Sequence, residues 1–574
     1  MKKGLFLLLV TSQYLLSCGT DAAKNNEVTT STDTATVKPN ILFILADDMG
    51  FTDISPFGGN ISTPVIESVS KESMLFSNYH VQPTCSPTRS SLLTGNDNHV
   101  AGLGIMSEMD YPALNNLHLP GYSGHLSNQV VTLPELLRGT GYHTYMTGKW
   151  HLGEGAGLDP HDRGFEESFI LGTGGGSHFN DRKALSPLQH MSYTHNGKEI
   201  EPPADFYSSR NYTDSMISFI DKNKDDKKPF FGYLSYTAVH DPLQAPEEYI
   251  KKYKGKFDMG WDSLRVLRTN NLKALGIVPE NMKMLSISAI PKWNTLPKEK
   301  QKEFARDMEV YAAMLDYMDM SIGRVIEYLK KQGMYDNTLI LFMSDNGANG
   351  AVASTYPGNE NGKYLGSFDN AFENRGLKNS YVEMGPGWAQ AVTGPFNLFK
   401  TFASEGGIRA PLIIKMPKES TVNGKWNRSF VHVTDIMPTI LEITGTAYPT
   451  EFRGNQIHPM IGKSILPVLT GKADAAYKDE GRGYELFEMK AYIKGKWKIL
   501  RQPIPFSTGK WQLFDLENDP GETTDLSANE PAICRELIKG WENYVIQNNV
   551  YDHHGHYDSV YKASYTPPSK KTKK

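Results

Sequence analysis

Short apolar runs alternate with amphipathic segments along most of the chain from Pro39 onward. Four runs rich in Ile, Leu and Phe predict buried strands, at residues 41–45, 230–234, 338–343 and 412–414. Apolar side chains also recur at helical spacing through residues 304–329, which predicts a long amphipathic helix packed on the sheet. Strands that alternate with helices are typical of an α/β domain with a largely parallel sheet.

The pattern changes after residue 471. Apolar stretches separated by Gly and Pro turns predict a small antiparallel sheet, with strands at residues 491–493, 497–500 and 511–514. A helix is predicted next, over residues 533–546. The resulting division is an α/β domain at 39–470, a C-terminal subdomain at 471–564 and a basic tail at 565–574. Residues 249–297 are less periodic, and we interpret them as an insertion near the sheet edge.

The composition and net charge limit the kinds of molecule that the protein is expected to bind. Of the 574 residues, 39% are hydrophobic and 22% are charged, as in folded water-soluble proteins. Sixty Lys and Arg residues stand against 64 Asp and Glu residues, a net charge of −4. Because no global basic field results, nucleic acid is not an expected partner.

The amino terminus predicts export. Two lysines at the start precede an apolar run, and the segment ends in Leu-Leu-Ser before Cys18. The run is too short to span a bilayer. This ending resembles the lipobox of bacterial lipoproteins, which implies a signal peptide over residues 1–18 and a lipid on Cys18 that holds the protein at a membrane. Ordinary secretory cleavage nearby is the alternative. We expect a periplasmic or cell-surface protein, with residues 19–38 as a flexible linker.

Three cysteines occur, at positions 18, 85 and 534, so no disulfide framework is expected. Cys534 lies on the predicted C-terminal helix, where a buried, inert thiol is expected.

Polar side chains follow the predicted strands at the end where each strand stops. Asp47 and Asp48 follow the first strand, Asp345 and Asn346 follow the strand at 338–343, and His240 follows the strand at 230–234. Open α/β sheets bind ligands at this edge. Taken alone, the aspartates could be a solvated helix cap, and the histidine could bond to backbone.

Residues 85–95 read CSPTRSSLLTG and carry the most information. Cys85 lies just before a predicted helix, with Pro87 in the first turn and Arg89 one turn on, a place that favours negative charge. The chemistry alone suggests a thiolate nucleophile, or else a small buried apolar residue. The string resembles the signature of type I sulfatases, in which this cysteine is oxidised enzymatically to Cα-formylglycine.

A second string, GYHTYMTGKWHLG at residues 141–153, resembles the second sulfatase signature. That signature contributes a lysine and a histidine to the sulfate pocket, which correspond to Lys149 and His151. Thr147 departs from the small or apolar residue usual in relatives. Alone, the Lys-Trp-His triplet would be read as an exposed turn.

The resemblance covers nearly the whole mature chain. Segments similar to bacterial arylsulfatases lie at residues 40–50, 160–165, 240–246, 344–347, 396–411 and 511–522. They imply the alkaline phosphatase-like fold, a large mixed, mostly parallel sheet flanked by helices with a smaller C-terminal subdomain. The resemblance also implies one calcium ion, held by Asp47, Asp48, Asp345, Asn346 and the modified Cys85. Hard oxygen ligands of this kind suit calcium or magnesium.

The resemblance further implies hydrolysis of sulfate monoesters by the hydrated formylglycine. Lys149 and Lys400 would hold the sulfate oxygens, and Arg89 would orient the nucleophile. His151 would assist release of sulfate. His240 would bind sulfate or protonate the leaving oxygen, a task shared with Lys400. The expected partners are a sulfate ester substrate and a formylglycine-generating maturation enzyme.

The substrate is left open between aryl sulfates and sulfated sugars. Asp241 stands where some relatives place an aromatic residue, and an acidic rim residue would suit a sulfated sugar at least as well. A phosphodiesterase or phosphonate hydrolase of the same superfold is the enzymatic alternative, and a noncatalytic lipoprotein that binds sulfated glycans is the other.

Three further features carry less weight. Glycines 174–176 predict a flexible rim, and His178 is a candidate for the substrate entrance. The cluster His553, His554 and His556 is expected to be a solvated loop, although it could bind a metal.

Overall fold

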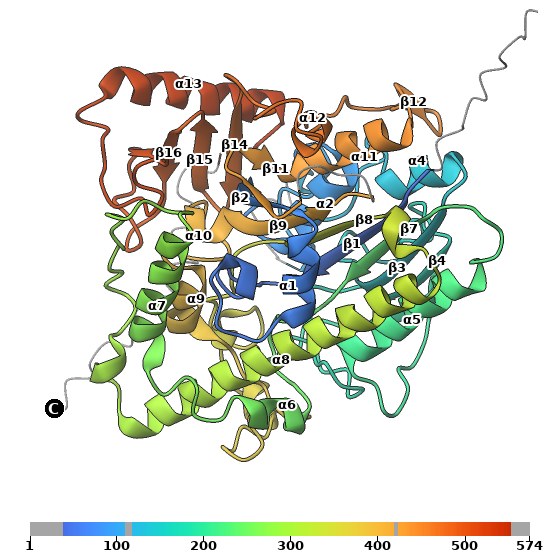
Figure 1. Cartoon of the computed structure of the whole chain (residues 1–574). Helices are drawn as coiled ribbons and strands as arrows, with labels where there is room; N and C mark the ends of the chain where they lie inside the picture. The colour runs from blue at the N-terminus through green and yellow to red at the C-terminus, as the bar shows by residue number, and fades with distance from the viewer. Residues whose placement is uncertain (1–37, 109–117, 418–422, 553–574) are drawn as a thin grey trace, which may run out of the picture. The chain divides into compact units, whose positions relative to one another are not determined.

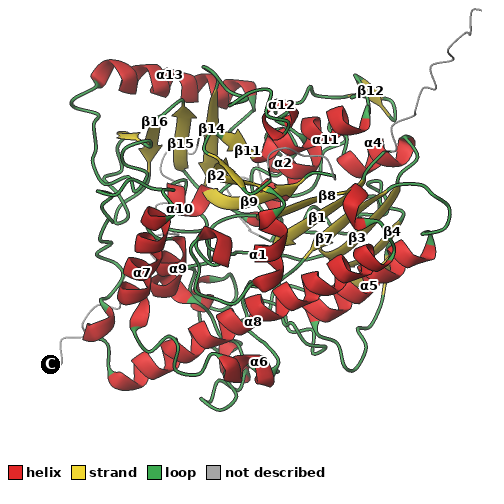
Figure 2. Cartoon of the chain, in the orientation of Figure 1, coloured by secondary structure: helices red, strands yellow, loops and turns green. Residues whose placement is uncertain are grey.

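The computed structural model describes residues 38–108, 118–417 and 423–552. Within them, eleven strands form one mixed sheet, drawn in Figures 1 and 2. Its order is β10-β2-β9-β8-β1-β7-β3-β4-β5-β6, and β11 also pairs with β2. The central strands are β1 (Asn40–Ala46), β3 (His143–Lys149), β7 (Phe230–Ser235) and β8 (Thr338–Ser344). The others are β2 (Met74–His80), β4 (Glu167–Leu171), β5 (Tyr193–His195), β6 (Lys198–Glu199), β9 (Arg409–Lys415), β10 (Lys425–Asn427) and β11 (Val431–His432).

The centre of the sheet is parallel, as the sequence predicts. β1 runs parallel to β7 and β8, with Ile41 opposite Phe231 and Leu339. β9 pairs antiparallel with β2 and β8, and β5 and β6 form an antiparallel edge. Side chains of β1 alternate between two hydrophobic clusters, one on each face. Burial on both faces explains why these strands are continuous apolar runs in the sequence.

Helices cover both faces of the sheet (Figure 1). One cluster joins the sheet to α1 (Pro64–Lys71), α5 (Ser208–Lys222) and α8 (Lys298–Lys331). The other joins it to α2 (Cys85–Thr94), α4 (Leu133–Gly139), α11 (Ile436–Thr444) and α12 (Leu466–Leu469). The long predicted helix is confirmed as α8, whose methionines at 308, 314 and 318 are fully buried. Among the described residues, no helix has the length and apolar character to cross a bilayer.

The segment interpreted as an irregular insertion contains helices. α6 (Glu247–Lys252) and α7 (Gly260–Ala274) lie there, and α7 packs against α9 (Gly385–Thr393). The buried face of α7 includes Arg268, whose guanidinium pairs with Asp53 at 2.6 Å. A buried arginine breaks the apolar spacing, which is why the sequence pattern did not predict this helix.

The C-terminal part is a four-stranded antiparallel sheet covered by α13 (Pro531–Gln547). Its strands are β14 (Gly481–Leu486), β15 (Met489–Lys494), β16 (Trp497–Arg501) and β17 (Gln512–Asp515). The three predicted strands and the helix are confirmed. β14 was not predicted, because Gly481 and Gly483 weaken its strand pattern. A Cβ on either glycine would lie within 2.4 Å of Tyr492 or Tyr544, respectively. Cys534 is buried, as expected.

The remaining short elements are α10 (Glu405–Ile408) and the hairpin of β12 (Glu451–Phe452) with β13 (Asn455–Gln456). Cys18, the predicted signal peptide and the histidines at 553, 554 and 556 lie outside the described residues.

Candidate active site

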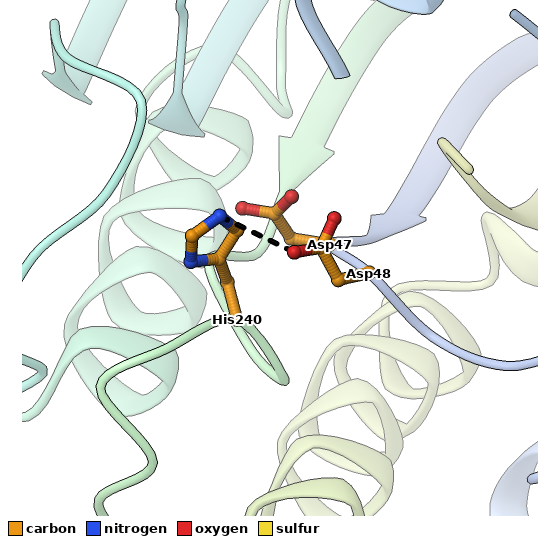
Figure 3. A group of neighbouring side chains, drawn as sticks. All are labelled: Asp47, Asp48 and His240. Carbon is orange, nitrogen blue, oxygen red and sulfur yellow. Dashed lines mark ion pairs between the residues drawn. The ribbon is translucent and has the colours of Figure 1, made fainter. Parts of the chain in front are cut away.

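The polar groups that follow the parallel strands meet at one edge of the sheet. Asp47 and Asp48 follow β1, Asp345 and Asn346 follow β8, and all four are at most 1% exposed. Lys149 is the last residue of β3, and His240 follows β7. Figure 3 shows the His240 ring beside the Asp48 carboxylate. The structure therefore brings together the strand-end residues that the sequence singled out.

Cys85 reaches this edge from the first turn of α2 and is 2% exposed. Its Sγ lies 3.3 Å from His151 Nδ1. Burial opposes ionisation of the thiol, but Lys149, Lys400 and His151 together lower its pKa to about 6. The environment thus favours negative charge at residue 85 near neutral pH.

Arg89, one turn along α2, is completely buried. Its Nε and Nη2 both donate to Asp345 Oδ2, at 3.0 and 2.7 Å. Nη1 donates to the Lys149 carbonyl at 2.9 Å and to the Ser235 hydroxyl. The guanidinium therefore ties α2 to the ends of three strands, a task that suits its rigid fork of donors.

His151 is fixed from its other side by a residue that sequence reasoning missed. Its Nε2 lies 2.9 Å from Glu108, in the loop after α2. Burial would lower the pKa of His151, but Glu108 and Cys85 raise it to about 9. In turn, although burial opposes it, His151 lowers the pKa of Glu108 to about 2. Glu108 belongs to an irregular loop, so no periodic pattern or strand end marks it in the sequence.

The carboxylates form a compact group of oxygen ligands. Asp47 accepts a hydrogen bond from Lys149 Nζ at 2.9 Å, and Asp48 accepts one from Lys400 Nζ at 2.9 Å. Ligand atoms of Asp47, Cys85 and Asp345 lie within 4.8 Å of one another. Burial raises the pKa of Asp47 well above its ordinary value despite Lys149, and Asp345 and Asp48 raise it further. A divalent cation would relieve this concentration of buried carboxylates.

An unpartnered atom supports the same interpretation. The Asn346 side chain donates to Asp48 Oδ1 at 2.6 Å through Nδ2, whereas its Oδ1 is buried and has no hydrogen-bond partner among the residues that the structure describes. Buried amide oxygens are rarely left unsatisfied. Because calcium and magnesium prefer carboxylate and amide oxygens, the residues present fit such an ion.

His240 and Lys400 form a linked pair. His240 Nδ1 donates to the Asp241 carbonyl at 2.7 Å, and Nε2 lies 3.2 Å from both Lys400 Nζ and Asp48 Oδ2. Burial lowers the pKa of His240 well below its ordinary value, although Asp48 opposes it. In contrast, Asp48 and Cys85 raise the pKa of Lys400 despite its burial. Lys400 is therefore the charged member, and neutral His240 accepts from it.

A cavity of about 180 Å³ opens above this group. Four of the six predicted catalytic residues line it: Cys85, His151, His240 and Lys400. Arg89 and Lys149 are instead paired with Asp345 and Asp47. The outer wall is largely apolar and is formed by Met106, Leu185, Leu188, Tyr356, Pro357 and Phe487. The charged floor and apolar wall suit an anion attached to an apolar group.

Comparison with known proteins decides the family. The family model described as Sulfatase matches residues 39–446, and that of the N-sulphoglucosamine sulphohydrolase C-terminal region matches residues 394–550. The chain belongs to the sulfatase family. An uncharacterised sulfatase of Schizosaccharomyces pombe is 41% identical over 89% of this chain and 94% of its own. The arylsulfatase of Klebsiella aerogenes is 40% identical over 76% of this chain and 93% of its own. This sulfatase is accordingly a sulfuric ester hydrolase.

Solved structures support the alkaline phosphatase-like fold expected from the sequence. The crystal structure of Ps i-CgsB with a neocarrahexaose superposes with a TM-score of 0.64 at 24% identity, covering 92% of this chain and 98% of that one. The phosphonate monoester hydrolase of Agrobacterium radiobacter has a TM-score of 0.53 at 17% identity, covering 89% and 96%. At these identities both structures support the fold alone, and the match to the sulfatase family model and to the arylsulfatase does not favour the phosphonate hydrolase alternative.

Two expectations about the entrance of the sulfatase cavity are wrong. Asp241 is 1% exposed and accepts a hydrogen bond from Asn349 at 2.9 Å, so it is not an acidic rim residue. His178 is equally buried, with Nε2 donating to the His240 carbonyl at 3.1 Å. Burial lowers the pKa of His178 to about 4. It is a neutral support for His240. Gly174 does line the cavity, where a Cβ would lie 3.0 Å from His151.

Proposed function

We propose that this sulfatase hydrolyses aryl sulfates, with Cys85 converted to Cα-formylglycine and one calcium ion bound beside it. One observation supports this most directly: Cys85 lies where a cavity with an apolar wall meets a cluster of buried cations and oxygen ligands. The cations suit a sulfate group, and the wall suits an aromatic leaving group.

The residues at the site suit both the calcium ion and the formylglycine. Asp47, Asp48, Asp345 and Asn346 would hold the calcium ion. The hydrated formylglycine would supply the oxygen nucleophile that attacks the sulfur of the sulfate ester, and the calcium ion would stabilise the negative charge of that oxygen. Because Cys85 is 2% exposed within a helix, we infer that the maturation enzyme acts before the chain folds.

The chain's own residues bind and orient the ester. Protonated Lys400 and His151 face the cavity and would hold the sulfate oxygens, while the charge of Lys149 acts from below. Lys400 would hold the proton given to the leaving oxygen, and the neutral Nε2 of His240 would orient Lys400 by accepting from it. Arg89 keeps Asp345 and the β3 end in place.

The leaving group would contact the apolar wall. Leu188 is 73% exposed at the cavity and is a direct test of this contact. We expect Leu188→Asn to lower kcat/KM for 4-nitrophenyl sulfate about 3–10-fold, from lost apolar contact. Leu275→Asn, at another exposed leucine, is the matched control and should leave kcat/KM unchanged. The proposed substrate class would be refuted if the enzyme hydrolysed a sulfated monosaccharide faster than the aryl ester. Hydrolysis of 4-nitrophenyl phosphate tests whether the enzyme prefers sulfate to phosphate.

Maturation and metal are tested separately. Mass spectrometry of the Cys85 peptide should show a species about 18 Da lighter than the thiol. EDTA should suppress turnover and calcium should restore it. Asp345→Ala should lower turnover about 10³-fold, a loss that added calcium does not repair. Turnover that is indifferent to both changes would remove the metal from the proposal.

We also propose that the protein is exported and held at a membrane surface by a lipid on Cys18. Cys18→Ala should then move the enzyme from the membrane fraction to the soluble fraction. Unchanged fractionation would exclude the lipid anchor.

A further inference from the structure

A second cavity, of about 340 Å³, lies where the C-terminal sheet and α13 meet the large α/β part. Its residues come from the end of α2, from β11, from β14 and from the inner side of α13. Cys85 begins α2 and Asn96 lies just past its end, so this helix separates the second cavity from the catalytic one. The volume falls at the lower end of the range for small-molecule sites.

Three polar atoms of this lining are buried without a hydrogen-bond partner among the described residues. They are Asn96 Oδ1, His432 Nε2 and Arg482 Nε. Asn96 and His432 are each 1% exposed. Buried polar atoms without a partner need an explanation, and three that belong to residues lining one cavity share a simple one, a bound ligand toward which these side chains turn.

The hydrogen-bonding roles of these atoms follow from their neighbours. The Thr434 N–H donates to His432 Nδ1, so Nε2 carries the ring proton. Burial lowers the pKa of His432 well below its ordinary value, and the ring is therefore neutral. Arg482 Nε is also a donor, whereas Asn96 Oδ1 is an acceptor. A ligand must supply two acceptors and one donor at close range.

The charge of the lining favours a neutral ligand. Arg482 already donates to the Ile461 carbonyl at 2.7 Å and to the Tyr477 hydroxyl at 2.8 Å. Tyr477 in turn bonds to Asp435, so the guanidinium charge is balanced. Asp97, the carboxylate in the lining, is paired with His99 at 2.9 Å. An added anion or cation would find no unpaired countercharge here.

The rest of the lining matches hydroxyl groups. Asn543 and Gln547 on α13 and Asn548 just past its end contribute amides, and Tyr492 and Tyr544 contribute rings. Amides both donate and accept, as sugar hydroxyls do, and tyrosine rings pack against the C–H faces of a sugar. We propose that this cavity binds a neutral sugar residue, independently of the sulfatase reaction.

Calorimetric titration of the full-length protein tests the proposal, with galactose and N-acetylglucosamine as the probes. A ligand of this size should bind with a Kd of about 1–10 mM. Asn543 is exposed and lines the cavity, so Asn543→Trp should fill the space and weaken binding at least about tenfold. Lys539→Trp, on an exposed position of the same helix, is the matched control and should bind as the wild type does.

Thermal melting establishes that both variants are folded, and Gln547→Trp is a second blocking variant should the first fail to fold. Absence of saturable heat for both sugars in the wild type, at about tenfold the expected Kd, would show that water alone fills the cavity and overturn the proposal. Equal binding by the wild type and Asn543→Trp would place the sugar elsewhere and overturn it as well.

Discussion

The active site can be compared with another group of buried charged side chains in the described part of this sulfatase, because the two groups differ in what surrounds them. In the active site, Lys400 and His151 line a cavity, and Asn346 leaves an oxygen without a partner. The second group, the domain-interface cluster, consists of His80, Glu405, Lys498 and Glu522, all at most 3% exposed. Burial of charge is common to both. The cavity distinguishes the site that acts on a substrate, because it is lined by Lys400 and His151 and by no residue of the second group.

The domain-interface cluster joins the large sheet to the C-terminal sheet. Lys498 on β16 lies 2.9 Å from Glu405 and 2.7 Å from Glu522. His80 on β2 lies 3.1 Å from the other oxygen of Glu405. Burial raises the pKa of Glu522 to about 7 even though Lys498 opposes it. The cationic and anionic side chains of this cluster pair with each other across the interface, an arrangement suited to holding the two sheets together.

Removing the sulfur of Cys85 should have the largest effect on activity and almost none on folding. Cys85→Ala removes the thiol group whose oxidation would produce the formylglycine, so the oxygen nucleophile cannot form and turnover of 4-nitrophenyl sulfate should fall at least about 10⁴-fold. Because the thiol is small, the free energy of unfolding should change by about 1 kcal/mol or less. Steady-state kinetics and urea unfolding measure the two quantities. Retention of the wild-type rate would remove Cys85 from the mechanism.

At the interface we expect the opposite pattern, a large loss of stability with little change in kcat. Lys498→Met removes the cation and leaves two buried carboxylates, so the free energy of unfolding should fall by about 3 kcal/mol or more. The fraction that remains folded should keep the wild-type kcat, because Lys498 and the two carboxylates with which it pairs are not among the residues that line the catalytic cavity. Lys496→Met, at an exposed lysine in the turn between β15 and β16, is the control and should be nearly neutral. A loss of kcat without a loss of stability would contradict the division between the two clusters.

Glu108 belongs to neither group, because it acts on the active site indirectly, through His151. Glu108→Gln keeps an acceptor for Nε2 and removes the charge, so kcat should fall about 10-fold with little change in KM. Glu108→Ala removes both and should cost about 100-fold, and Glu108→Asp should restore part of the activity. Glu154, which accepts from Ser192 instead, provides the control Glu154→Gln. Equal losses in all three Glu108 variants would indicate a merely structural role.

The sequence predicted the parts of the active site that follow regular elements. Asp47, Asp345 and His240 could be placed together because parallel strands end at one edge of a sheet, whereas Lys149 was assigned through its resemblance to the second sulfatase signature. Glu108 could not, since its position depends on how an irregular loop returns to His151. Asp241 was misplaced for a related reason: the residue number puts it beside His240, but the backbone turns its side chain inward, toward Asn349.

The fold shows the same division. Because the central strands are buried on both faces, their sequences are continuous apolar runs that predict strands. The helix α8 carries a continuous apolar stripe along one side, which predicts a helix in the same way. α7 was missed because a buried ion pair interrupts its stripe, and β14 because glycines make room for tyrosine rings. Tertiary partners supply the stability in both cases, and those partners are distant in sequence.

A third buried group, around His99, provides the smallest test and one that depends on pH. His99 Nδ1 lies 2.9 Å from Asp97 and Nε2 lies 3.2 Å from Glu485 on β14, with Tyr122 and Tyr544 packed around the ring. Burial lowers its pKa, but hydrogen bonds to Asp97 and Glu485 raise the value to about 9. This histidine is therefore protonated in the folded protein at neutral pH and ties the loop after α2 to β14 of the C-terminal sheet.

The sign of the pH dependence follows from linkage. An unfolded histidine titrates near 6.5, so the folded state binds the extra proton between the two values. The stabilisation is complete below about pH 6.5 and is lost as the pH rises through about 9. The difference in unfolding free energy between the wild type and His99→Gln should shrink by about 2 kcal/mol from pH 7 to pH 9. Urea unfolding at each pH measures it, and His161→Gln, at an exposed histidine, should show no such trend. A difference that stays constant would mean that His99 is neutral in the folded protein.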